Sequence, residues 1–210
     1  MAEQLRVLPA VVVTGARQTG KSTLAEELVG GSRRYFTLDD FDVRDAARRD
    51  PDSLVGHKTP VTIDEVQREP DLMRAIKRSI DKDRRAGRFL LTGSANLLLM
   101  RRVSESLAGR ASYLTLWPMT RGEQLGEGRA GHWDALIGSD DGDWLDILQS
   151  IKAQREDWQP LALRGGYPTP ALELRTARAR AIWFESYVRT YLERDLQDLS
   201  TITALPDFQR

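Results

Sequence analysis

The chain has 210 residues, of which 31 are basic and 31 acidic, so its formal net charge is zero and gives no overall field to attract nucleic acid. The absence of cysteine excludes disulfides and thiolate metal sites. No apolar run reaches the length of about 18 residues that a membrane-spanning helix needs, and the polar first residues are not a secretory signal. We therefore expect a cytoplasmic protein.

The first part of the chain alternates short apolar strands with helical segments. Strands are expected at Val7–Val13, Tyr35–Leu38, Val61–Ile63, Phe89–Thr92 and Tyr113–Leu116. Helices are expected at Lys21–Val29, at Asp42–Asp52, after Pro70 and at Leu97–Ala108. This alternation predicts an α/β fold with an open, mostly parallel sheet, helices on both faces and a ligand site at the carboxyl ends of the strands.

The strand pattern stops near residue 121. A short helix is expected at Leu145–Lys152 and a turn at Arg164–Pro168. Thr169 and Pro170 then predict the start of a long helix. Its apolar face, which we interpret as core packing rather than a base-stacking surface, carries Phe184, Tyr187, Val188, Tyr191, Leu192, Leu196 and Leu199. We therefore divide the chain into a nucleotide-binding core, 1–120, and a helical C-terminal segment, 121–210.

A phosphate-binding sequence follows the first strand. Residues Gly15 to Ser22 match G-x-x-x-x-G-K-[ST] in full, directly after an apolar strand and directly before a helix. Such a loop turns its backbone N–H groups toward the phosphates, while Lys21 adds a charge and the Ser22 hydroxyl binds Mg²⁺. The expected nucleotide contacts are Gly15, Ala16, Arg17, Gln18, Thr19, Gly20, Lys21, Ser22 and Thr23.

Two carboxylates end the third apolar strand. In a phosphate-loop protein one carboxylate helps to hold Mg²⁺, and a second can orient and deprotonate the attacking water. We assign Asp64 to the metal and Glu65 to the water. Adjacent residues on a strand point to opposite faces, so we expect the two to play different roles.

Two further catalytic residues are expected. The fourth strand ends in small polar side chains, Thr92, Ser94 and Asn96, of which Ser94 is favoured as the residue that senses the γ-phosphate. Arg110 is the favoured cation for neutralising the transition state, either in its own subunit or in a neighbouring one.

Several motifs occur in a fixed order along nearly the whole chain. They are Gly15–Ser22, Asp64–Gln67 followed by Pro70, Leu91–Ser94, Ser106–Arg110, Gly165–Pro168 and Tyr191–Asp195. In this combination the chain resembles the AAA-type ATPases of bacteria and archaea that carry a DUF4143 region after the ATPase domain. The resemblance implies a P-loop NTPase three-layer sandwich with strand order 5-1-4-3-2, ATP and Mg²⁺ as ligands, and Glu65 as the base. Members of that family continue with a winged-helix-like segment and a further domain, so we expect this chain to be a shortened member or a fragment.

The leading hypothesis is an ATPase that acts as a conformational switch on an unknown protein partner, with a homo-oligomer as one form it can take. A nucleotide-dependent binding module with negligible hydrolysis is the main alternative. A P-loop small-molecule kinase is less favoured, because neither an arginine-bearing lid nor an acceptor pocket is identifiable. A DNA-binding ATPase would use scattered arginine pairs, and the neutral net charge argues against it.

Overall fold

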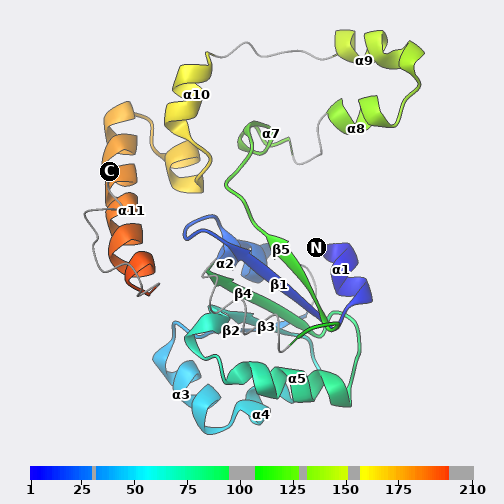
Figure 1. Cartoon of the computed structure of the whole chain (residues 1–210), viewed down its shortest axis with the longest axis vertical. Coiled ribbons are helices and arrows are strands. Elements are labelled where there is room, and N and C mark those ends of the chain that lie inside the picture. The colour runs from blue at the N-terminus through cyan, green and yellow to red at the C-terminus, as the bar shows by residue number, and fades with distance from the viewer. Residues whose placement is uncertain (30–31, 95–106, 128–131, 151–156, 199–210) are drawn as a thin grey trace. The chain divides into compact units, whose positions relative to one another are not determined.

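The computed structural model of the chain describes residues 1–29, 32–94, 107–127, 132–150 and 157–198 (Figure 1). The chain forms two compact units, Met1–Trp117 and Pro118–Arg210. Among the helices within the described ranges, none is both long enough and apolar enough to cross a membrane. The helix expected at Leu97–Ala108 lies almost entirely outside the described residues.

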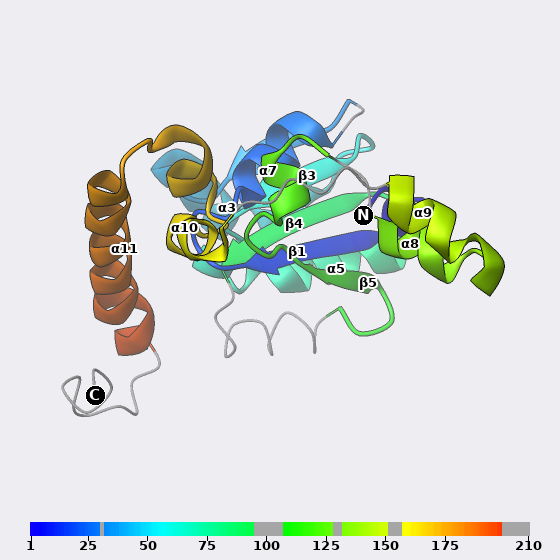
Figure 2. The same cartoon turned by 90° about the horizontal axis from the view of Figure 1, so that it is seen from above.

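The first unit is built on a sheet of five parallel strands in the order β2-β3-β4-β1-β5. The strands are β1 (Ala10–Gly15), β2 (Arg34–Thr37), β3 (Val61–Asp64), β4 (Phe89–Ser94) and β5 (Ala111–Thr115). Figure 2 looks down on the sheet and shows β4, β1 and β5 side by side, with α5 (Leu72–Lys82) beneath them. The α/β class and the strand order implied by the resemblance are confirmed.

Helices cover both faces of this sheet and make three layers. On one face α3 (Phe41–Arg49), α4 (Pro51–Val55) and α5 bury the larger core. On the other face α1 (Ala2–Val7) and the helical turns after β1 pack against Val11, Val13 and Leu90. Val12 belongs to the first core and its two neighbours to the second, because side chains alternate along a strand. The consecutive valines of β1 are therefore buried on both faces.

Prolines shift two element boundaries away from the sequence-based expectations. Pro9 separates α1 from β1, so the first strand begins at Ala10, and Val7 ends a helix with 75% of its surface exposed. The helix expected at Asp42–Asp52 is two helices, because Pro51 lacks an N–H and disfavours a helical residue before it. The Asp50 carboxylate accepts a hydrogen bond from the Ser53 N–H (3.0 Å) and caps the second helix.

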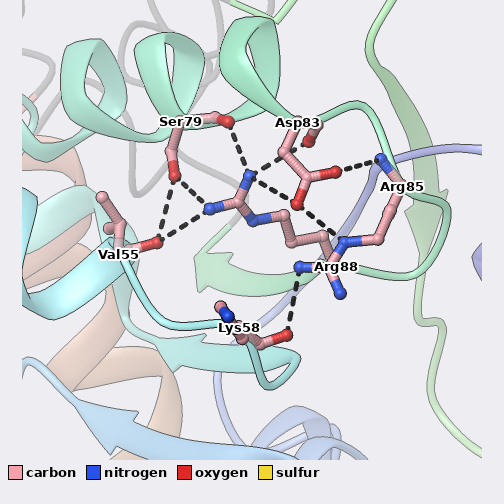
Figure 3. A network of polar contacts seen from close by, with 6 residues as sticks. All are labelled: Val55, Lys58, Ser79, Asp83, Arg85 and Arg88. Atoms are coloured by element: carbon pink, nitrogen blue, oxygen red, sulfur yellow. Dashed lines mark hydrogen bonds and ion pairs between the residues drawn. The ribbon is translucent and has the colours of Figure 1, made fainter.

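A buried arginine joins α4, α5 and the start of β4 (Figure 3). Arg88 is 7% exposed, and burial lowers the pKa of its guanidinium. Its Nη1 donates to the carbonyls of Ser79 (2.6 Å) and Asp83 (3.0 Å), and its Nη2 donates to the Ser79 hydroxyl (2.5 Å) and the Val55 carbonyl (3.4 Å). Arg88 thus adds donors to carbonyls in the C-terminal turns of two helices, beside the Asp83 N–H that also donates to the Ser79 carbonyl (3.1 Å).

The second unit is helical in its described part, as expected. Its helices are α7 (Arg121–Gln124), α8 (His132–Ile137), α9 (Trp144–Ser150), α10 (Trp158–Arg164) and α11 (Ala177–Asp198). The long helix expected from Thr169 is interrupted: a π-helical turn, Thr169–Glu173, ends at Leu174, and a new helix begins at Ala177. The Thr176 hydroxyl accepts from the Ala179 N–H (3.2 Å) at that start.

Aromatic side chains hold the turn after α10 against α11. Trp183 stacks on Tyr187 with ring centroids 5.2 Å apart, and the Tyr167 hydroxyl donates to that of Tyr187 (3.1 Å). The face expected to be core is thus packed at Phe184 and Tyr187, whereas Val188 is 51% and Tyr191 42% exposed. The side chains of Leu192 and Leu196, and Leu199 itself, lie outside the described part of the chain.

Candidate nucleotide-binding site

The carboxyl ends of the parallel strands place three predicted motifs at one edge of the sheet. In the strand register Gly15 of β1 lies beside Ser94 of β4, and Ile63 of β3 lies beside Leu91 of β4. Asp64, the residue after Ile63, ends β3 at this edge. The phosphate loop, the acidic pair and the polar end of β4 are therefore neighbours, although up to 79 positions separate Gly15 from Ser94 in the sequence.

The phosphate loop has the unusual backbone angles that its sequence predicts. Gly15 has φ +154° and Gly20 has φ +92°, and Gln18, which is not glycine, has φ +59°. A Cβ at Gly15 would lie 2.3 Å from the Leu116 carbonyl oxygen, because the chain leaving β5 passes directly against it. The loop is therefore fixed between β1 and the end of β5.

Two side chains of the loop turn back onto it. Lys21 Nζ donates to the Ala16 carbonyl oxygen (2.7 Å), and the Thr19 hydroxyl donates to the same oxygen (2.9 Å). Both side chains are buried, with Lys21 only 5% exposed. The lysine ammonium is therefore held against the backbone of the loop and away from solvent.

The helix after the loop is shorter than expected. An α-helical turn, α2 (Lys21–Thr23), continues as a π-helical turn over Leu24–Leu28 instead of an α-helix to Val29. Ser22 and Thr23 are exposed on the first turn, where a ligand can reach their hydroxyls, and Arg17 is half-buried. The first N–H groups of a helix have no acceptor within the helix, and such a terminus favours an anion.

Asp64 is a buried carboxylate held by hydroxyls from the two neighbouring strands. It is 4% exposed, and its Oδ2 accepts from the Tyr35 hydroxyl of β2 at 3.0 Å. Its Oδ1 accepts from the hydroxyl of Thr92 on β4. Burial, together with the charge and hydrogen bond of Asp64, raises the pKa of Tyr35, so its hydroxyl stays a donor.

Glu65 differs from Asp64 because it has left the strand. Its φ of +55° lies in the left-handed region, where residues other than glycine are uncommon. Its N–H donates to the Thr92 hydroxyl (3.3 Å), and its carboxylate accepts from the Gln67 side-chain amide. The separation of the two carboxylates thus comes from this turn and not from strand alternation, which was the expected reason.

The polar end of β4 contributes Thr92 to this network. Thr92 is completely buried and links the Glu65 N–H to the Asp64 carboxylate. Ser94 ends the strand beside Gly15, but its side chain, like the whole of Asn96, lies outside the described residues.

Arg110 lies at the opposite edge of the sheet from the phosphate loop. Its carbonyl accepts from the N–H of Ala10, the first residue of β1, whereas the loop follows the last. At about 3.3 Å per residue, β1 separates the two edges by roughly 17 Å. The Arg110 guanidinium pairs with Asp81 at 2.7 Å, and this hydrogen bond holds the pKa of the Asp81 carboxyl below its usual range. The structure does not bring Arg110 to the phosphate loop of its own chain.

Sequence reasoning missed Tyr35 and gave no role to Gln67. Tyr35 was read only as the start of a strand, and its contact with Asp64 requires the order β2-β3, which no local pattern encodes. Gln67 was visible only as part of the motif after the acidic pair. The Tyr35 side chain contacts Asp64, and the Gln67 side chain contacts Glu65.

Comparison with known proteins adds a family to this geometry. The family model described as an AAA domain (AAA_14) matches residues 8–125, and the model of a domain of unknown function, DUF8612, matches residues 155–210. The C-terminal match is thus to a different domain from the DUF4143 region that the resemblance implied.

Two relatives are uncharacterized proteins of Mycobacterium tuberculosis (strain ATCC 25618 / H37Rv) and Mycobacterium bovis (strain ATCC BAA-935 / AF2122/97). Each is 37% identical to this chain over 193 residues, which is 91% of this chain and 37% of the relative. The chain therefore spans just over a third of the length of these relatives.

Proposed function

The chain belongs to the AAA domain family, and from this membership we propose that it binds ATP with Mg²⁺ and hydrolyses ATP. One observation carries the proposal: an enclosed phosphate loop with a buried lysine lies at the same sheet edge as two carboxylates in different environments. Hydrolysis would act as a conformational switch on a partner protein. The ATPase core is proposed to be residues 1–120, with the helical segment 121–210 following it.

The phosphate loop is proposed to bind the triphosphate. The backbone N–H groups between Gly15 and Gly20 would surround the phosphates, and Lys21 would exchange the Ala16 carbonyl for a phosphate oxygen. Ser22 and Asp64 are the residues that would hold Mg²⁺. The positive charge of the ion would offset the negative charge of the β- and γ-phosphates. Both residues fit this role, because the Ser22 hydroxyl is exposed and the Asp64 carboxylate, fixed by two hydroxyls, retains lone pairs on both oxygens.

Glu65 is proposed to be the general base. Its carboxylate lies outside the buried Asp64 network, at the sheet edge where the γ-phosphate would end. A carboxylate in that place can accept a proton from the attacking water while Lys21 stabilises the charge on the phosphate. Ser94, beside Gly15, is proposed to contact the γ-phosphate.

Arg110 is proposed to act on the nucleotide of a neighbouring copy of the chain. Its place at the opposite edge of its own sheet favours this arrangement over action within one subunit. The oligomer that this requires is part of the proposal.

The test is steady-state phosphate release from ATP with Mg²⁺, measured together with ATP affinity. We expect wild type to turn over, Glu65→Gln to bind ATP without turnover, and Lys21→Ala to lose ATP affinity. Glu27→Gln, an exposed carboxylate change on the turn after the loop, is the matched control and should behave as wild type. Wild type that binds ATP and releases no phosphate would instead indicate a nucleotide-dependent binding module.

A further inference from the structure

Gln67 lies beside Glu65 in the turn that follows β3. We infer that Gln67 is a positioning residue for the Glu65 carboxylate, and that position 93 is glycine because its missing side chain leaves room for the Gln67 amide. The inference rests on the proposed role of Glu65 as the general base.

The need for a positioning residue follows from the backbone of Glu65. Because Glu65 has φ +55° and lies beyond the last residue of β3, the sheet does not fix the direction of its side chain. The next residues, Val66–Arg68, form a 3₁₀ turn that brings Gln67 back toward it. The Gln67 Nε2 then donates to Glu65 Oε2, a hydrogen bond to a charged acceptor that restricts the carboxylate to one orientation.

Gly93 lies on the other side of the Gln67 amide. A Cβ built on Gly93 would lie 2.6 Å from the Gln67 Oε1 and 3.7 Å from its Cδ. The φ of Gly93 is not among the positive values, so its backbone would accept an alanine. The obstacle to a side chain at position 93 is therefore the end of a flexible side chain, which can move without disrupting the sheet.

These contacts predict a specific defect. A base that loses its orientation lowers the rate of the chemical step, and small misplacements of reacting groups can cost up to about a hundredfold in rate. The phosphate loop holds the nucleotide through other residues, so ATP affinity should not change. Displacing the Gln67 amide with Gly93→Ala should reproduce the effect of removing it with Gln67→Leu.

The experiment measures kcat and ATP affinity for Gln67→Leu, Gly93→Ala and the double variant of the full chain. We expect each single variant to lose about tenfold or more in kcat at unchanged ATP affinity. The double variant should lose no more than the worse single variant, because both changes break one contact. Gln149→Leu, an exposed glutamine in α9, is the matched control and should keep wild-type values. Additive losses, or losses of ATP affinity, would overturn the inference.

A second measurement does not depend on hydrolysis. The NMR resonances of the Gln67 side-chain amide should shift when Glu65 is replaced by alanine, and should shift similarly in Gly93→Ala. Resonances that respond to neither change would overturn the inference whatever the rates. Absence of phosphate release from wild type would count against the proposed ATPase, and the amide resonances would still decide whether Gln67 holds Glu65.

Discussion

The Tyr35 hydroxyl donates to Asp64 Oδ2 at 3.0 Å and so joins the edge strand β2 to the acidic end of β3. Thr92 donates to the other oxygen of the same carboxylate from β4. A buried carboxylate needs such donors, since an unpaired charge is costly away from water. Asp64 is therefore held in place from both sides.

Replacing Tyr35 by phenylalanine should destabilise the first unit. The substitution keeps the ring and removes one donor from a buried charged acceptor, which should cost about 1 to 3 kcal/mol in the free energy of unfolding. Urea unfolding at neutral pH measures it. Tyr191→Phe, at an exposed tyrosine of α11, is the matched control and should change stability little. Equal stability of Tyr35→Phe and wild type would show that Asp64 does not depend on this hydroxyl.

The same tyrosine predicts how stability depends on pH in the alkaline range. Burial, and then the charge of Asp64, raise the pKa of Tyr35 in the folded chain. Above about pH 10, the ordinary tyrosine pKa, the unfolded chain loses this proton while the folded chain keeps it. The unfolded state then binds fewer protons, so stability falls as pH rises.

Urea midpoints measured at rising alkaline pH should therefore decline more steeply for wild type than for Tyr35→Phe. Burial also raises the pKa of Tyr113, so the variant should retain part of the decline. Parallel curves for the two proteins would contradict the prediction.

Most of the first unit was predictable because its strands have strong local signals. Val11, Val12 and Val13 indicate a strand buried on both faces, and the glycines of the phosphate loop fix the turn that follows. The strand order came from resemblance rather than from these residues. Two of the boundaries that differ from expectation lie at prolines: Pro9 delays the first strand and Pro51 divides a helix.

The candidate site was predictable only where its residues are consecutive. The phosphate loop and the acidic pair are local motifs, whereas Tyr35 and Thr92 reach Asp64 from different strands. The left-handed backbone of Glu65 could not be anticipated, because residues other than glycine seldom adopt it. Strand alternation was also a sufficient explanation for different roles of the two carboxylates. Arg110 has the residue type expected of a catalytic cation. Its distance from the loop follows from its place directly before the first residue of β5, because the loop lies at the opposite end of the parallel strands.

Arg88 should be a major source of stability in the first unit. Arg88→Met would keep much of the buried side-chain volume but remove four donated hydrogen bonds, leaving the carbonyls of Val55, Ser79 and Asp83 without this donor. Losing several buried hydrogen bonds at once should cost about 3 kcal/mol or more in the free energy of unfolding. Urea unfolding is again the measurement.

Arg85→Met tests whether arginine loss alone explains that effect. Arg85 pairs with Asp83 at 2.7 Å but is largely exposed, so its removal should cost less than about 1 kcal/mol. Arg88→Lys should not restore stability. The two terminal nitrogens of the planar guanidinium donate to three carbonyls and a hydroxyl, and a single ammonium cannot donate to all four acceptors. Full rescue by lysine would show that charge, rather than this geometry, is what matters.

The placement of Arg110 predicts complementation between two inactive variants. Lys21→Ala should lose phosphate binding but retains Arg110, and Arg110→Ala retains the phosphate loop. If Arg110 completes the site of a neighbouring copy, mixing the two variants should restore part of the phosphate release, because some interfaces then pair an intact loop with an intact Arg110. Activity of the mixture equal to the sum of the separate variants would place Arg110 outside the neighbour's site. Asp81→Asn provides a further check, since it removes the negative charge that pairs with the guanidinium and leaves Arg110 itself in place.

Two glycines of the phosphate loop should respond differently to alanine. Both have positive φ, so each substitution introduces backbone strain of about 1 to 3 kcal/mol. At Gly20 no atom in the described part of the chain lies within 4 Å of the added Cβ, whereas at Gly15 it would meet the Leu116 carbonyl oxygen at 2.3 Å. That oxygen cannot move freely, because the Leu116 N–H donates to the Thr14 carbonyl (2.6 Å) and fixes the chain after β5 to β1.

Gly15→Ala should therefore lower the free energy of unfolding further than Gly20→Ala and displace the loop from the end of β5. Urea unfolding of the two variants would reveal the difference, and equal destabilisation would mean that the contact with Leu116 does not constrain the loop.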